Sequence, residues 1–279
     1  METEVLVNNS CTSFESRDSG HSGGRANILG FEVDRISLDD CVRYLDKAIE
    51  QRQSCHVVLV NAAKIVKAYL DKELALIINS ADLVGADGVP IVWASWLFGR
   101  PLPGRVNGTD LMDKLIELSV EKGHSVYLLG ARQEVIDRAV EGLCGTYPSL
   151  KIAGYRNGYF ATKQDELNAV ADIVASKPDV LFVGMSSPMK EKWVRRHIDR
   201  LSTIPVIHGV GGSFDILSGL TKRAPRWMQN CGLEWFYRVL QEPGRMWKRY
   251  LFTNSIYIAL VMRELLRRMF RKSNKSNLG

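Results

Sequence analysis

The chain has 279 residues, of which 46% are hydrophobic and 24% are charged. This composition is typical of a globular protein and excludes a disordered chain, a collagen-like repeat and a small disulfide-stapled module. The five cysteines show no metal-ligand spacing, which favours reduced thiols.

The charge is divided unevenly along the chain. Residues 221–279 hold 13 Lys and Arg against three acidic residues, a net charge of +10, whereas residues 1–220 carry a net charge of −4. Such a basic segment is typical of a surface that meets phosphate groups, either in nucleic acid or in anionic lipid. No run reaches the roughly 18–20 apolar residues of a membrane-spanning helix.

Residues 1–26 are polar and rich in serine and glycine, which predicts a disordered leader. They lack the basic and apolar regions of a signal peptide.

Short apolar runs alternate with helical patterns over residues 27–220, which we expect to form one domain. Strands are predicted at residues 28–33, 55–60, 83–86, 125–129, 180–183 and 206–208. Helices are predicted after Ser37 and at residues 62–70, 71–80, 89–98, 109–122, 133–144, 164–176 and 189–200. Continuously apolar strands that alternate with helices predict an α/β fold, a Rossmann-like parallel sheet with helices on both faces.

Residues 221–279 differ in composition from the rest of the chain. Residues 225–271 have a helical pattern in which cationic and aromatic side chains alternate along the segment. This mixture suits the headgroup layer of a bilayer and predicts a basic appendage that docks on an anionic membrane. A helical subdomain with inward-facing aromatics is an alternative. Nucleic acid is a weaker third one, because no recognised binding motif is present.

Polar or glycine-rich segments follow five of the predicted strands. They are Asn61, Asp87-Gly88, Gly130-Ala131, residues 184–188 (GMSSP) and residues 209–213 (GVGGS). Ligands of parallel α/β sheets gather at the carboxyl ends of the strands, and helix N-termini there attract anions. A phosphate-bearing substrate is therefore expected. No segment fits a Walker loop or the GxGxxG dinucleotide motif, so no cofactor is predicted.

Asp87 is the leading candidate for a general base, because it ends a strand in an apolar setting and precedes a flexible glycine. The alternative is that Asp87 caps the helix that begins at Val89. Arg105 lies in a loop rich in proline and glycine, where it would either grip a diphosphate or lie in solvent. Thr109 or Asp110 is expected to cap the helix that follows.

Lys190 lies in the first turn of a predicted helix, where the macrodipole disfavours a cation, and this suggests an anionic partner. Asp215 would bind ribose hydroxyls or cap a helix. The histidines show no mutual spacing and no DxD sequence occurs, so no metal site is predicted.

Several motifs resemble the WecG/TagA/CpsF glycosyltransferases, in the family's order and over about residues 28–253. They are residues 60–63 (VNAA), 86–91 (ADGVPI), 103–111 (PGRVNGTDL), 183–193 (VGMSSPMKEKW), 209–215 (GVGGSFD), 223–228 (RAPRWM) and 232–235 (GLEW).

The resemblance implies an inverting, metal-independent transfer of a sugar from a nucleotide sugar to a polyprenyl-diphosphate-linked acceptor. It implies synthesis of teichoic acid, capsule or exopolysaccharide at the cytoplasmic face of the inner membrane. It assigns Asp87 as the base, with Asn61 and Arg105 in the active site. The substrate-binding candidates are Gly88, Asn107, Gly130, Gly184, Pro188, Lys190, Glu191, Gly211, Gly212, Asp215, Arg223, Arg226 and Arg238.

Two positions depart from the family pattern. Leu59 stands where many members have threonine, and Lys190 stands where many have glutamine. The sugar therefore stays open between N-acetylmannosamine, glucose, galactose and a uronic acid. A non-catalytic protein that binds nucleotide sugar or lipid diphosphate is the alternative function, and a homo-oligomer is left open.

Overall fold

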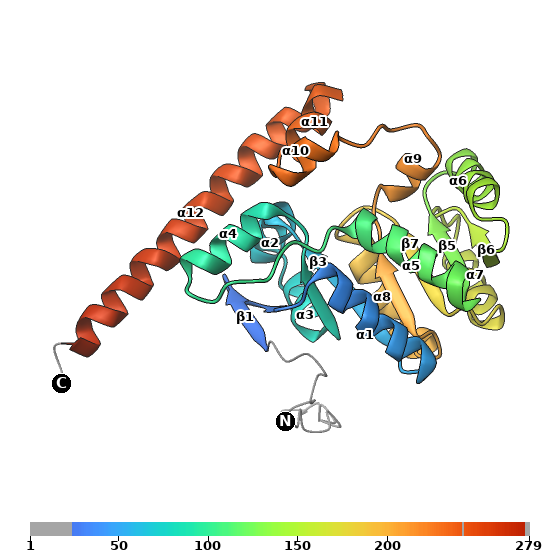
Figure 1. The fold of residues 1–279 in the computed structure, drawn as a ribbon, viewed down its shortest axis with the longest axis horizontal. Coiled ribbons are helices and arrows are strands. Elements are labelled where there is room, and N and C mark those ends of the chain that lie inside the picture. The colour runs from blue at the N-terminus through green and yellow to red at the C-terminus, as the bar shows by residue number, and fades with distance from the viewer. Residues whose placement is uncertain (1–23, 242, 277–279) are drawn as a thin grey trace, which may run out of the picture.

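The computed structural model describes residues 24–241 and 243–276 (Figure 1). At its centre, six parallel strands form one sheet in the order β4-β3-β8-β7-β5-β6. The strands are β3 (Cys55–Val60), β4 (Leu83–Ala86), β5 (Ser125–Gly130), β6 (Lys151–Arg156), β7 (Val180–Gly184) and β8 (Val206–Gly209). The predicted α/β architecture with a Rossmann-like parallel sheet is confirmed.

Helices cover both faces of this sheet. One face packs against α1 (Leu38–Glu50), α5 (Gly108–Lys122) and α6 (Gln133–Thr146). The other packs against α2 (Ala62–Leu70), α3 (Lys72–Ser80), α7 (Lys163–Ala175) and α8 (Met189–Leu201). Because both faces are covered, every residue of β3 is buried, which explains its unbroken apolar sequence. The short helix α9 (Ser213–Leu217) follows β8.

The N-terminal part of the described chain differs from the single strand predicted at residues 28–33. It forms an antiparallel hairpin of β1 (Arg25–Ile28) and β2 (Phe31–Asp34). Leu29 and Gly30 both have positive φ, 55° and 90°, the backbone that a tight two-residue hairpin turn requires. Two residues assigned to the leader, Arg25 and Ala26, thus belong to β1, and residues 1–23 of that leader lie outside the described residues.

Strand β6 was not predicted. It is an edge strand, and none of its residues is fully buried, so it lacks the apolar run by which the central strands are recognised.

The C-terminal segment is helical as expected, but it is divided into three helices. They are α10 (Arg226–Asn230), α11 (Glu234–Gln241) and the 34-residue α12 (Pro243–Ser276). Gly232, with φ of 72°, lies in the turn between α10 and α11. We call residues 221–276 the C-terminal appendage.

Helix α12 packs along α2 and α4 (Val89–Leu97), as Figure 1 shows. The Tyr257 hydroxyl donates to the Pro90 carbonyl (3.1 Å), and Arg268 donates to the Phe98 carbonyl (3.0 Å) while its guanidinium lies over the Phe98 ring. Tyr257 and Val261 are buried in the same core as α2 and α4. The appendage is therefore packed against the α/β domain along much of α12.

Candidate active site

A cavity of about 500 Å³ opens at the carboxyl ends of β3, β7 and β8. Its volume lies within the range of small-molecule sites in proteins. The lining side chains are largely polar. Among the predicted site residues, those that line the cavity are Asn61, Asp87, Asn107, Lys190, Gly211, Gly212 and Asp215.

Asp87 lies between two asparagines. Asn61 Nδ2 donates to its Oδ2 (3.3 Å), and Asn107 Nδ2 donates to its Oδ1 (3.2 Å). Both amides are held in place because their oxygens cap helices: Asn61 accepts from the Lys64 amide (3.0 Å), and Asn107 accepts from the Thr109 amide (3.0 Å). The capping fixes which end of each amide faces the carboxylate.

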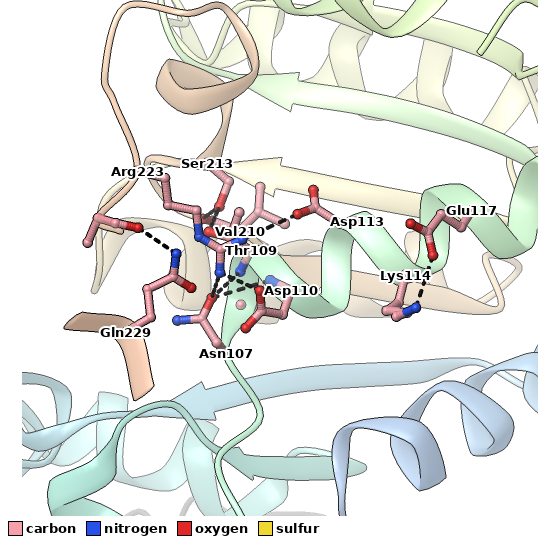
Figure 2. A network of polar contacts seen from close by, with 12 residues as sticks. Asn107, Thr109, Asp110, Asp113, Lys114, Glu117, Val210, Ser213, Arg223 and Gln229 are labelled. Atoms are coloured by element: carbon pink, nitrogen blue, oxygen red, sulfur yellow. Dashed lines mark hydrogen bonds and ion pairs between the residues drawn. The ribbon is translucent and has the colours of Figure 1, made fainter. Parts of the chain in front are cut away.

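Two predicted caps are corrected by this arrangement. The N-cap of α4 is Gly88, which has no side chain to cap with, and Asp87 does not take that role. The N-cap of α5 is Asn107 rather than Thr109 or Asp110. Thr109 instead lies 3.0 Å from the Ser213 hydroxyl, as Figure 2 shows among the contacts around the start of α5.

Lysines supply the positive charge of the cavity. Lys64 Nζ lies 2.7 Å from Glu191 Oε1, and Lys190 Nζ lies 3.2 Å from the same oxygen. All three side chains are at least nine-tenths buried. Two ammonium groups thus share one carboxylate oxygen beside the cavity, and Asp87 is a further negative charge near Lys190. Glu191, predicted to bind substrate, does not line this cavity and instead holds the two lysines.

The buried charges shift one another's ionisation. Burial, with the nearby Lys64 ammonium, lowers the pKa of Lys190 to about 8. Burial alone would raise the pKa of Glu191, but the Lys64 and Lys190 ammonium groups lower it to about 2. The carboxylate is therefore ionised at neutral pH, and Lys190 is still largely protonated there.

Lys64 and Lys67 line the cavity from α2 and were not predicted. They lie three residues apart just after Asn61, so both follow a strand end on one side of a helix. Lys67 Nζ donates to the Ser187 carbonyl (2.6 Å). That contact ties α2 to the loop before α8.

The predicted arginines do not line the cavity. Arg105 Nη1 lies 3.6 Å from Glu234 Oε2 in α11. Arg223 is ion-paired with Asp110 and with Asp113 (3.5 Å) in α5, as Figure 2 shows. Arg226 is exposed, and the side chain of Arg238 lies outside the described residues.

Gly130 and Gly184 were predicted to approach substrate, but both serve close packing. A Cβ at Gly130 would lie 2.4 Å from the Gly184 carbonyl oxygen, and one at Gly184 would lie 2.3 Å from the Phe214 ring. The cavity touches Ser186 and Ser187 rather than Pro188, and Gly88 lies beside it without lining it.

Two of the histidines are buried, His208 completely and His56 with 9% of its surface exposed. Burial lowers the pKa of His56 and His208 to about 4, so both are neutral at pH 7. His208 Nε2 lies 3.1 Å from the Gly108 carbonyl at the start of α5.

Within residues 24–241 and 243–276, no group of three or more His, Cys, Asp or Glu side chains is placed to hold a metal ion. None of the helices in that range, α12 included, is long and apolar enough to cross a membrane.

A parallel α/β sheet with a cavity at its carboxyl edge, lined by the Asp87 carboxylate and three lysines, is typical of an enzyme. Residues 26–271 match the model of the glycosyl transferase WecG/TagA/CpsF family. The chain belongs to this family of glycosyltransferases.

Two relatives share the name N-acetylglucosaminyldiphosphoundecaprenol N-acetyl-beta-D-mannosaminyltransferase. The one from Bacillus subtilis (strain 168) is 33% identical over 235 residues, which cover 84% of this chain and 90% of that protein. The one from Staphylococcus aureus (strain MW2) is 30% identical over 251 residues, which cover 89% of this chain and 96% of that protein.

Proposed function

We propose that this protein transfers a sugar, with inversion, from a nucleotide sugar to an acceptor linked to a polyprenyl diphosphate. The acceptor class follows the names of the relatives, which act on N-acetylglucosaminyldiphosphoundecaprenol. The observation that carries the proposal is the Asp87 carboxylate, oriented by Asn61 and Asn107 in a cavity that three lysines also line.

In this mechanism, Asp87 accepts the proton of the acceptor hydroxyl while the hydroxyl oxygen attacks the anomeric carbon. The bond from that carbon to the phosphate oxygen breaks, and the nucleoside diphosphate leaves with an additional negative charge. Asn61 and Asn107 keep both carboxylate oxygens in place through their donated hydrogen bonds. Such preorganisation favours the transition state, because no reorientation is needed during the reaction.

Lys190 is the proposed partner of the leaving diphosphate. Lys190 borders the cavity, and its Nζ shares Glu191 Oε1 with Lys64. We propose that lysine charge serves where other glycosyltransferases use a divalent metal. Arg105 and Arg223 hold carboxylates in this structure, so their predicted contacts with the diphosphate require those ion pairs to open.

We further propose that the appendage docks on an anionic membrane, at the cytoplasmic face of the inner membrane where such acceptors are used. Exposed apolar side chains follow one another along α12 at spacings of seven, four, four and three residues, from Leu251 through Ile258, Met262 and Leu266 to Met269. Arg263 and Arg267 are exposed beside them. Apolar and cationic side chains in this pattern suit the surface of an anionic bilayer.

The donor sugar depends on the two departures from the family pattern, and both line the cavity. Leu59 packs against β4, where a Cβ at Gly85 would lie 2.5 Å from its Cδ2. An apolar side chain and an ammonium group thus replace two neutral polar ones. UDP-linked N-acetylmannosamine, glucose, galactose and glucuronate are the donors to compare.

The test is turnover with a synthetic polyprenyl-diphosphate N-acetylglucosamine acceptor and these four labelled donors. We expect one donor to give labelled lipid, undiminished by EDTA. Asp87→Asn should abolish transfer while its melting temperature and nucleotide binding stay at wild-type values. Asp137→Asn, on the exposed face of α6, is the matched control.

Full activity in Asp87→Asn would overturn the assignment of the base. Nucleotide-sugar binding without turnover in the wild type, with every donor and acceptor tried, would favour the alternative of a non-catalytic binding protein.

A further inference from the structure

The appendage places a carboxylate beside the proposed base. Glu234, in the first turn of α11, accepts a hydrogen bond from Asn107 Nδ2 to its Oε2 (3.3 Å). The same Asn107 nitrogen donates to Asp87 Oδ1 (3.2 Å). One amide nitrogen therefore connects a carboxylate of the appendage with the carboxylate proposed as the base.

The hydrogen bonds of the Asn107 side-chain amide fix the orientation in which its nitrogen faces both carboxylates. Its oxygen accepts from the backbone amides of Thr109 (3.0 Å) and Asp110 (3.3 Å), which are the second and third amides of α5. Its nitrogen carries two protons, which match the two carboxylates. A reversed amide would give up both helix-capping bonds and turn its oxygen toward Asp87 and Glu234. Asn107 Nδ2 thus donates one of its protons to Asp87 and the other to Glu234.

Arg105 offsets the charge that Glu234 brings. Its Nη1 lies 3.6 Å from the same Oε2 atom, and the two side chains are only about one-fifth exposed. Without this cation, two carboxylates would lie close together in a partly desolvated place, which costs free energy. Arg105 is thus placed to stabilise Glu234 next to the cavity rather than to line the cavity.

The backbone of the appendage is shaped to bring Glu234 to this position. Gly232 has φ of 72°, and a Cβ there would lie 2.9 Å from the Val89 side chain at the start of α4. The chain therefore passes against α4 before α11 begins. The amide of Leu233 then donates to the Met228 carbonyl (2.8 Å), which joins the turn to α10.

The geometry points to Glu234 as a positioning residue: when the appendage is seated on the α/β domain, Glu234 holds the Asn107 amide in the orientation that aligns Asp87. This inference rests on the proposed function for its kinetic consequence. The alignment of the proposed base then depends on Glu234, a residue of the appendage that is proposed to dock on the membrane. Turnover would therefore depend on the contact between the appendage and the α/β domain.

The kinetic test compares Glu234→Ala with Glu234→Gln, which keeps an oxygen that accepts from Asn107. We expect Glu234→Ala to lower kcat on the order of tenfold, the effect of losing one charge-assisted hydrogen bond. The KM for the donor should stay within about twofold, and Glu234→Gln should recover most of kcat. Glu264→Ala removes another carboxylate of the appendage, paired with Arg268, and should leave kcat unchanged.

A spectroscopic test needs no turnover. The side-chain amide signals of Asn107, identified by their loss in Asn107→Ala, should shift in Glu234→Ala and not in Glu264→Ala. Wild-type kcat together with unshifted Asn107 signals in Glu234→Ala would overturn the inference, as would a lower kcat that Glu234→Gln does not recover. If the wild type transfers no donor, the proposed function fails, and the Asn107 signals still decide the contact.

Discussion

Lys64 Nζ and Glu191 Oε1 lie 2.7 Å apart beneath the cavity, with both side chains almost completely buried. Lys190 uses the same carboxylate oxygen at 3.2 Å. Glu191 therefore holds both ammonium groups beside the cavity through one oxygen.

Glu191→Gln should destabilise the fold by about 3–5 kcal/mol, since it leaves two buried ammonium groups without their anion. Urea unfolding at pH 7 measures the change. Glu117→Gln removes a carboxylate from an exposed pair with Lys114 and should cost no more than about 1 kcal/mol. Equal costs for the two variants would contradict the importance of the buried pair.

The same carboxylate should contribute to acid sensitivity. Its pKa of about 2 lies below the ordinary value of 4.5, so the folded state is favoured by its ionised form. That contribution is fully present above pH 4.5 and is lost as the pH falls toward 2. The acid side of the stability profile should therefore be shallower in Glu191→Gln between pH 4.5 and 2.

Nucleoside diphosphate binding should weaken above pH 8 because Lys190, whose pKa is about 8, then loses its charge. Affinity should fall toward about tenfold per pH unit when one protonated group is required for binding. Calorimetric titration between pH 6.5 and 9.5 measures it. Lys190→Met should bind weakly with a flat profile over that range.

Lys192→Met is the matched control, because Lys192 lies on the same helix but pairs with Asp71 and Glu73 outside the cavity. Its profile should follow the wild type. A wild-type affinity that is constant from pH 7 to 9.5 would contradict the role given to Lys190.

Gly184→Ala should lower stability by about 1–3 kcal/mol, the usual cost of overpacking, because its Cβ would collide with the completely buried ring of Phe214. Gly145→Ala, in α6 with open space around it, should be neutral or slightly stabilising. Thermal melting separates the two. An unchanged melting temperature in Gly184→Ala would show that this glycine is not needed for packing.

Membrane binding should depend on the exposed apolar side chains along α12. Replacing Met262 and Leu266 together by glutamate should abolish cosedimentation with vesicles that contain phosphatidylglycerol, because it removes apolar contact and adds repulsion. Leu76→Glu changes an even more exposed apolar residue, on α3, and should bind as the wild type does. Equal cosedimentation of all three proteins would argue against docking through α12.

The sequence alone determined the features that depend on near neighbours in the chain. The apolar runs of β3 and β7 predicted a covered parallel sheet, and the polar residues after β3 and β4 predicted that Asn61 and Asp87 would each lie at its carboxyl edge. These inferences succeed because a parallel strand covered on both faces has an unbroken apolar sequence. The residues that follow such a strand lie at the carboxyl edge of the sheet.

Only the tertiary structure decided which distant groups share the available charges. Glu234 meets Asn107 across 127 residues, and Glu191 meets Lys64 through the packing of α8 against the α2 side of the sheet. Arg105 and Arg223 looked available for a diphosphate, yet carboxylates of α11 and α5 hold them. The sequence around a residue shows whether its side chain is polar. Which side chain it pairs with depends on how distant helices pack together.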